Sequence, residues 1–246
     1  MPGSIRKAQI RSQVWDRLRR HAIVRAPGVY GHTPRFRGAS ASAARLRDTD
    51  IWRAAQRVLV LSERVLEAVR AAALADGKQL LIPDLRRIEP GWVQEIAPAG
   101  LDDSAAAQVA REGALPRAAY LRGREVKRVD LMVIGAVAVS GDGDRVGKGR
   151  GEADLVYALG RERGFLGAET PVAVVVHDLQ VVEGIAAREP TDLPIDLIAT
   201  PEQTVMVDTL LMRPKGLHPS MITPERLSDF PGLRAILEQE GLAVPE

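Results

Sequence analysis

The chain has 246 residues, 46% hydrophobic and 27% charged, which is the composition of a globular protein that can bury a large core. It contains no cysteine, which excludes disulfide bonds, thiolate metal sites and a cysteine nucleophile. The formal net charge of +2 does not by itself predict nucleic-acid binding, and no apolar run is long enough to span a membrane. Its N-terminal region lacks the apolar stretch of a signal peptide, so we expect a cytoplasmic protein.

The first fifty residues are rich in arginine and poor in acidic side chains. Within them, Ser4 and the helical spacing of the apolar residues predict a helix that runs to about Val24. The Gly-, Pro- and Arg-rich segment 25–39 predicts an ordered loop, and a second helix is expected over 40–53. A basic segment of this kind can bind an anionic ligand or keep the protein soluble, and the sequence leaves both readings open.

Short apolar runs then alternate with helical patterns along most of the chain. This alternation predicts an α/β fold with a largely parallel sheet. The predicted strands are residues 57–62, 79–82, 129–134, 171–176 and 195–199, and the predicted helices are residues 63–76, 102–111 and 152–163.

The C-terminal part has weaker signals. Residues 201–206 predict an edge strand or a turn, and the tail from about residue 212 is rich in proline. We expect this tail to be partly extended, with a short helix near 231–240. No linker divides the chain, so residues 1–246 are interpreted as a single domain.

A glycine-rich turn over 141–151 leads from a predicted strand into a predicted helix. Glycines 147, 149 and 151 alternate with Lys148 and Arg150, and Arg145 precedes them. Glycine lets backbone N–H groups approach an anion closely, and the following helix adds the positive end of its dipole. This arrangement predicts a phosphate site, although a flexible turn with solvated charges would have the same composition. Asp154, in the first turn of the helix, can stabilise the dipole or bind Mg²⁺.

The sequence R-V-G-K-G-R-G-E-A-D resembles the signature R-[LI]-G-x-G-x-G-[YF]-[YF]-D of the 5-formyltetrahydrofolate cyclo-ligases. The matching residues are Arg145, Gly147, Gly149, Gly151 and Asp154. Two further features agree with this family. The first helix carries the basic pair Lys7 and Arg11, four residues apart and therefore on one face, and Asp196 lies in a late strand.

The resemblance implies a Rossmann-like three-layer α/β/α fold and the ATP- and Mg²⁺-dependent closure of 5-formyltetrahydrofolate to 5,10-methenyltetrahydrofolate. Lys7 and Arg11 would hold the ATP phosphates, and Arg145 and Lys148 would act in catalysis by stabilising the transferring phosphoryl group. Asp154 and Asp196 would bind the metal. The resemblance assigns the nucleotide to Lys7, Arg11, Arg145, Gly147, Lys148, Gly149, Arg150, Gly151 and Glu152.

The chain departs from the signature at Glu152 and Ala153, where the family has two aromatic residues. In this respect it is similar to a divergent branch, the methenyltetrahydrofolate synthetase domain-containing proteins. The alternative function is therefore a nucleotide-binding module without cyclo-ligase activity, including one associated with RNA. We expect a small-molecule partner, a reduced folate, and no membrane partner; the sequence does not predict an oligomeric state.

Some further residues have open roles. The family has a substrate-contacting acid after its first strand, and Glu63 and Glu67 both follow that strand here. His177 comes after a predicted strand, where it can act as a base or a ligand, or cap a turn. Arg35 and Arg37 flank Phe36, so they can stack on a ring or belong to an ordinary surface loop.

Overall fold

A central eight-stranded sheet forms the body of the computed structural model, which describes residues 2–24, 28–116, 118–185 and 187–244. The strands of this sheet are β1 (Arg57–Val60), β2 (Gln79–Pro83), β3 (Val93–Ile96), β4 (Tyr120–Leu121), β5 (Leu131–Gly135), β8 (Val172–Val175), β10 (Leu197–Ala199) and β11 (Thr204–Met206). Their order is β11-β10-β8-β5-β1-β2-β3-β4. The five strands from β10 to β2 are parallel, and β11, β3 and β4 pair antiparallel at the two edges.

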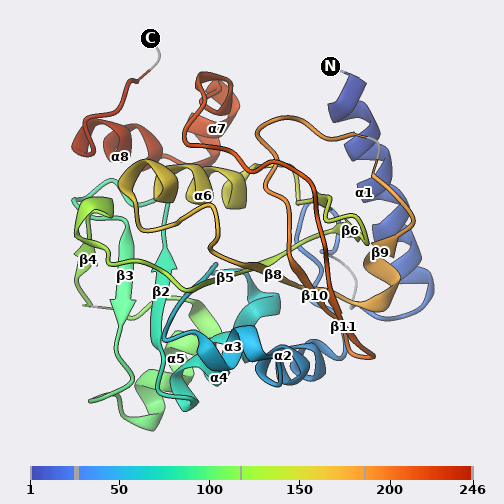
Figure 1. Cartoon of the computed structure of the whole chain (residues 1–246), viewed down its shortest axis with the longest axis horizontal. Coiled ribbons are helices and arrows are strands. Elements are labelled where there is room, and N and C mark those ends of the chain that lie inside the picture. Colours follow the sequence, from blue (N-terminus) through green and yellow to red (C-terminus); the bar gives the residue numbers. More distant parts are fainter. Residues whose placement is uncertain (1, 25–27, 117, 186, 245–246) are drawn as a thin grey trace.

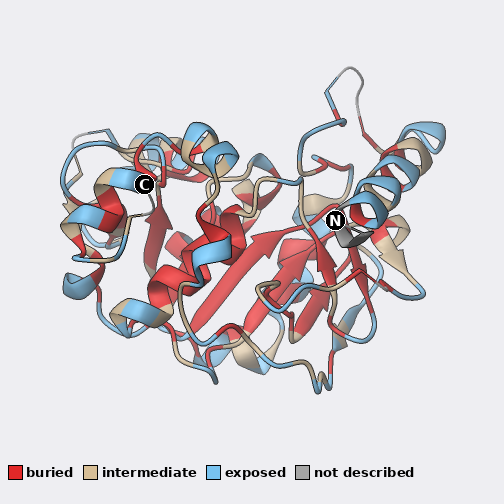
Figure 2. Ribbon diagram, turned by 90° about the horizontal axis from the view of Figure 1, so that it is seen from above, coloured by how far each residue is buried: buried red, intermediate tan, exposed pale blue. Residues whose placement is uncertain are grey.

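Helices lie on both sides of this sheet (Figure 1). The α-helices are α1 (Pro2–Arg20), α2 (Ala39–Arg47), α3 (Asp50–Ala54), α4 (Glu67–Ala75), α5 (Asp103–Glu112), α6 (Glu152–Arg163), α7 (Pro224–Asp229) and α8 (Leu233–Gln239). Figure 1 shows α6, α7 and α8 on one side and α2 to α5 on the other. Because both faces are covered, the strands β5, β8 and β10 are buried at every residue (Figure 2).

A smaller sheet lies beside α1. Its strands, in the order β7-β6-β9, are β6 (Ala138–Ser140), β7 (Arg145–Val146) and β9 (Val181–Val182). β6 and β7 form an antiparallel hairpin, and Arg17 of α1 donates a hydrogen bond to the carbonyl of Leu179, just before β9. This packing brings the N-terminal half of α1 to the segment that follows β7.

The layered, largely parallel architecture confirms the predicted fold class. The predicted helix over 152–163 is confirmed with the same bounds, β11 is the edge strand, and α8 is the C-terminal helix. Residues 207–218 form neither helix nor strand, in agreement with an irregular tail. In the part of the chain that the structure describes, no helix has the length and apolar character needed to cross a membrane.

The predicted bounds of the first helix were wrong, because α1 begins before Ser4 and ends before Val24. Ala22 adopts a positive φ of 52°, and the N–H of Ile23 bonds back to the carbonyl of Leu18 at 3.0 Å. This left-handed closure ends the helix, and Val24 then pairs antiparallel with Phe36. In the predicted loop 25–39, residues 25–27 lie outside the described residues.

Three other predictions of local structure need correction. The helix expected over 40–53 is two helices, since Thr49 caps α3 by accepting a hydrogen bond from the N–H of Trp52. The turn expected over 141–151 contains β7. The strands β3, β4, β6 and β9 and the helix α7 were not predicted, because elements this short show little periodicity.

Candidate functional site

The glycine-rich loop occupies residues 147–151, between β7 and α6. Gly149 and Gly151 have φ angles of 113° and 72°, which residues with a side chain rarely adopt. Gly151 is also the N-cap of α6. The loop therefore ends where the free N–H groups and the positive dipole end of a 12-residue helix are exposed to a ligand.

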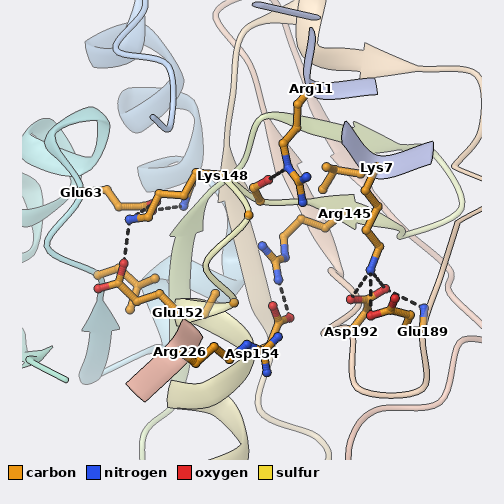
Figure 3. Close-up of a pocket in the computed structure, with 17 residues that line it drawn as sticks. Lys7, Arg11, Glu63, Arg145, Lys148, Glu152, Asp154, Glu189, Asp192 and Arg226 are labelled. Carbon is orange, nitrogen blue, oxygen red and sulfur yellow. Dashed lines mark hydrogen bonds and ion pairs between the residues drawn. The ribbon is translucent and has the colours of Figure 1, made fainter. Parts of the chain in front are cut away.

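A cavity of about 240 Å³ lies between this loop, α1 and the carboxyl ends of β1 and β5 (Figure 3). The residues that line it are Lys7, Arg11, Leu61, Glu63, Gly135, Arg145, Val146, Gly147, Lys148, Gly149, Gly151, Glu152, Ala153, Asp154, Glu189, Asp192 and Arg226. This set contains as many cationic as carboxylate side chains. An anion that arrives together with a divalent cation therefore suits the cavity better than an anion alone.

The floor of the cavity is the buried ion pair between Arg145 and Asp154. Asp154 also accepts a hydrogen bond from the N–H of Leu193 at 2.9 Å. Burial alone would raise the pKa of Asp154, but the charge of Arg145 and the Leu193 N–H outweigh it, so the pKa lies below its ordinary value. The Nε of Arg145 is buried without a hydrogen-bond partner among the described residues, so Asp154 does not satisfy every donor of this guanidinium.

Two cations from α1 form the next part of the cavity. The Nζ of Lys7 lies 2.6 and 2.8 Å from the carboxylate oxygens of Asp192, and Arg11 donates from Nε to the carbonyl of Gly147 at 2.7 Å. Burial and the nearby charge of Arg145 lower the pKa of Arg11. Two arginines close enough to repel each other are stabilised by an anion between them.

A wall of ionic side chains closes the cavity on the side of β1. Lys148 contacts Glu152 at 2.6 Å and Glu63 at 3.8 Å, and Arg86 reaches Glu152 at 3.2 Å. Burial would raise the pKa of Glu152, but Lys148 and Arg86 outweigh it and hold that pKa below its ordinary value. Glu63 is fixed by the hydroxyl of Thr33 and by the N–H of Gly135.

Beyond this wall lies a second cavity of about 420 Å³, which shares Glu63, Lys148 and Glu152 with the first. Val24, Val29 and Thr33 belong to its lining, together with three arginines: Arg35, Arg64 and Arg86. Figure 3 shows Lys148 between Glu63 and Glu152, so the shared wall consists of alternating charges. Of the two acids that follow the first strand, Glu63 therefore lies at the cavities, whereas Glu67 pairs with Arg35 at 3.3 Å.

Most of the residues predicted for the site do line the first cavity, but Arg150 and Asp196 do not. Arg150 contacts Asp229 of α7 at 3.7 Å. Asp196 pairs with Arg213 and accepts a hydrogen bond from the N–H of Val172. The structure thus does not bring Asp196 together with Asp154, because Asp196 precedes β10, at the amino end of that strand, and ligands bind at the carboxyl ends.

Glu189, Asp192 and Arg226 line the cavity but were not predicted from the sequence. Asp192 stands four residues before Asp196. An acidic residue near the late strand was expected to hold the metal, and sequence position alone does not separate these two carboxylates. Arg226 lies in the short helix α7, whose start is signalled in the sequence by the N-cap Thr223, by Pro224 and by the acidic Glu225 in the first turn.

The other residues singled out earlier lie away from the first cavity. The Nδ1 of His177 accepts a hydrogen bond from the N–H of Leu179 and so caps a turn, which agrees with the structural reading of this histidine. Phe36 packs edge-on against its ring, with 5.6 Å between ring centroids. Arg35 lines the second cavity.

The carboxylates of the first cavity fit a magnesium ion that is delivered with a nucleotide. Within the described ranges, no group of three or more histidine, aspartate or glutamate side chains could hold a metal ion without further ligands. Mg²⁺ commonly uses one or two carboxylates together with phosphate oxygens. Asp154 and Asp192 can supply such a pair, since both line the cavity.

The model of the 5-formyltetrahydrofolate cyclo-ligase family matches residues 4–201. The human methenyltetrahydrofolate synthase domain-containing protein is 33% identical over 244 residues, which cover 96% of this chain and 62% of the human protein. The Danio rerio protein of the same name is 32% identical, covering 95% of this chain and 63% of its own length. The chain thus spans less than two thirds of these relatives.

Among solved structures, the chain matches the NMR structure of Aquifex aeolicus 5,10-methenyltetrahydrofolate synthetase. The TM-score is 0.54, and the match covers 82% of this chain and 93% of the other at 18% identity. At this identity the likeness shows a shared fold.

Proposed function

Because the chain belongs to the 5-formyltetrahydrofolate cyclo-ligase family, we propose that it is an ATP- and Mg²⁺-dependent cyclo-ligase. Its substrate would be 5-formyltetrahydrofolate or a closely related reduced pterin. The observation that supports this proposal best is the first cavity, where four of the five lining cations come from α1, β7 and the glycine-rich loop, beside a helix N-terminus. These cations are Lys7, Arg11, Arg145 and Lys148.

In the proposed reaction, the formyl oxygen attacks the γ-phosphorus of ATP and the bond to the bridging oxygen of ADP breaks. The N10 nitrogen then attacks the activated carbon, phosphate leaves with its oxygen, and N10 releases its proton. Arg145, held in place by Asp154, and Lys148 would neutralise the charge on the transferring phosphoryl group. Lys7 and Arg11 would orient the remaining phosphates.

Asp154 and Asp192 would hold Mg²⁺, which supplies charge neutralisation between phosphate oxygens when bound. In the free protein Asp192 is engaged by Lys7, and Asp154 by Arg145. Lys7 would free an oxygen of Asp192 on turning to a phosphate, whereas Asp154 would keep Arg145 on its Oδ1 and offer Oδ2 to the metal. Binding of the metal and of the nucleotide should therefore be mutually dependent.

The second cavity, on the far side of Lys148, would receive the substrate to be cyclised. Glu63 lies at its boundary, close to the site of phosphoryl transfer. The arginines of this cavity suit a substrate that carries carboxylates.

A second candidate function is a nucleotide-binding module without cyclo-ligase activity. The observation that favours it is the pairing of Glu152 with Lys148 and Arg86 where the family signature has an aromatic residue. An ionic wall provides no aromatic face on which a pterin ring could stack.

The test is to mix protein, Mg-ATP and 5-formyltetrahydrofolate and follow the absorbance of the methenyl product. We expect an ATP-dependent rise that falls about 100-fold in Lys148→Gln, because this removes a charge at the transferring group. Arg53→Ala, which removes a surface charge on α3, serves as the control and should keep full activity. If absorbance stays flat while calorimetry detects ATP binding, the second candidate replaces the first.

A further inference from the structure

The helix α7 packs on the glycine-rich loop although it lies beyond residues 4–201, which the family model matches. A Cβ atom placed on Gly151 would lie 2.5 to 2.8 Å from three guanidinium atoms of Arg226. The guanidinium therefore rests directly on this glycine. A second contact joins Arg150 of the loop to Asp229 of α7 at 3.7 Å. The helix α7 thus contacts the loop through two side chains, Arg226 and Asp229.

Arg226 is held in place so that it faces the first cavity (Figure 3). Its Nη1 donates to the carbonyl of Met221 at 2.9 Å, and its backbone N–H bonds to the hydroxyl of Thr223, which caps α7. The charge of Arg226 is one of the influences that lower the pKa of Asp154. Arg226 thus adds a positive charge to the cavity, whereas Arg150 of the loop is directed to Asp229.

The first cavity is too small to enclose a whole nucleotide. Its volume is about 240 Å³, whereas pockets that bury a drug-sized ligand measure roughly 300–1,000 Å³. The polyphosphate fits it, and the rest of the nucleotide must extend into a neighbouring space. Two cavities adjoin the first: the second cavity at Lys148, and a third of about 690 Å³ that shares Glu189 and Arg226.

The third cavity has the chemistry of a nucleoside site. Pro190, Pro214 and Leu217 supply apolar surface, and Thr191, His218 and Ser220 supply hydroxyl and imidazole groups. The charged residues of its lining are two carboxylates and two cations, which balance: Glu162, Glu189, Lys215 and Arg226. Apolar walls with a few polar groups suit a planar base joined to a hydroxylated sugar. In the lining of the second cavity, by contrast, the four cations outnumber the two carboxylates, which suits an anionic substrate.

We propose that the C-terminal segment completes the nucleotide site of this chain. The nucleoside part of ATP occupies the third cavity, between residues 189–191 and 214–220, and Arg226 contacts the phosphates where they enter the first cavity. This places the γ-phosphate at Lys148, next to the second cavity, so that nucleotide and acceptor approach the reaction point from opposite sides. The inference rests on the proposed function only in taking the nucleotide to be ATP.

The test measures binding affinity by calorimetry on the full chain, with two probes: Mg-ATP, and inorganic tripolyphosphate with Mg²⁺. Tripolyphosphate reports on the phosphate part of the site alone, whereas ATP reports on the phosphate and nucleoside parts together. Arg226→Gln should weaken both probes about 10-fold, since it removes a charged phosphate contact. Leu217→Trp and Thr191→Trp, which enlarge two residues of the lining of the third cavity, should weaken ATP binding about 10-fold or more and leave tripolyphosphate binding within twofold. Leu210→Trp is the matched control, because Leu210 is 96% exposed in the same segment.

The inference is overturned if both tryptophan variants melt like the wild type and bind ATP equally well, or if the wild type binds neither probe. It is also overturned if the tryptophan variants weaken tripolyphosphate as much as ATP. ATP binding that follows the expected pattern without formation of the methenyl product would contradict only the proposed function. Turnover with an unchanged KM for ATP in both tryptophan variants would contradict only this inference.

Discussion

The floor and the wall of the first cavity each contain a buried carboxylate from the first turn of α6, but the two are neutralised differently. On the floor, Asp154 and Arg145 are both buried and bound to each other. In the wall, Glu152 is buried, but its partners Lys148 and Arg86 are partly exposed. The floor is thus a rigid, preformed element, whereas the wall can rearrange. The departure from the family signature lies in the wall, on the side of the second cavity.

The strongest test of this comparison is Asp154→Asn, which leaves Arg145 buried without its countercharge. We expect the free energy of unfolding to fall by about 3–5 kcal/mol, the usual cost of breaking a buried ion pair. Urea denaturation followed by circular dichroism measures this change. A loss below about 1 kcal/mol would mean that Arg145 readily finds water or another acceptor, and the floor would then not be rigid.

Glu152→Gln should have a smaller effect, about 1–2 kcal/mol, because Lys148 and Arg86 can turn toward solvent once the charge is gone. The same denaturation experiment measures it beside Asp154→Asn. Equal losses in the two variants would remove the distinction between floor and wall. Glu152→Gln should also change substrate affinity more than ATP affinity, since Glu152 borders both cavities but belongs to the side of the acceptor.

The smallest expected effect is on the pH dependence of stability. The folded-state pKa values of Asp154 and Glu152 lie below their ordinary values, so their contribution is fully present above about pH 5 and is lost as the pH falls through the folded pKa values. Glu152→Gln should therefore lose less stability than the wild type between pH 5 and pH 3. Parallel curves for the two proteins in acid denaturation would show that Glu152 gains nothing from its partners.

The sequence predicted what depends on local pattern. The bounds of α6 were correct, and glycines 147, 149 and 151 do lie between β7 and α6, because helical periodicity and glycine spacing are encoded within a few neighbouring positions. The family resemblance was confirmed by the match over residues 4–201. The assignment of nucleotide and metal to individual residues stays a prediction that the experiments above address.

The features that sequence could not predict depend on tertiary packing. Lys148 and Arg150 are equivalent in the motif, yet the first lines the cavity and the second contacts Asp229, because α7 occupies one side of the loop. Arg226 enters the cavity from a six-residue helix whose position depends on contacts across the molecule. The fixed orientation of Glu63 likewise depends on Thr33 and Gly135, which are distant in sequence.

The contact between Lys7 and Asp192 joins residues 185 positions apart. During synthesis at about 5–20 residues per second, α1 therefore leaves the ribosome roughly 10–40 seconds before its acidic partner has been made. In that interval the nascent chain can pair its early strands, but Asp192 and Glu189, the carboxylates that pair with Lys7, have not yet been made. Because Arg226 is added later still, a chain terminated before this residue would lack one of the cations of the first cavity.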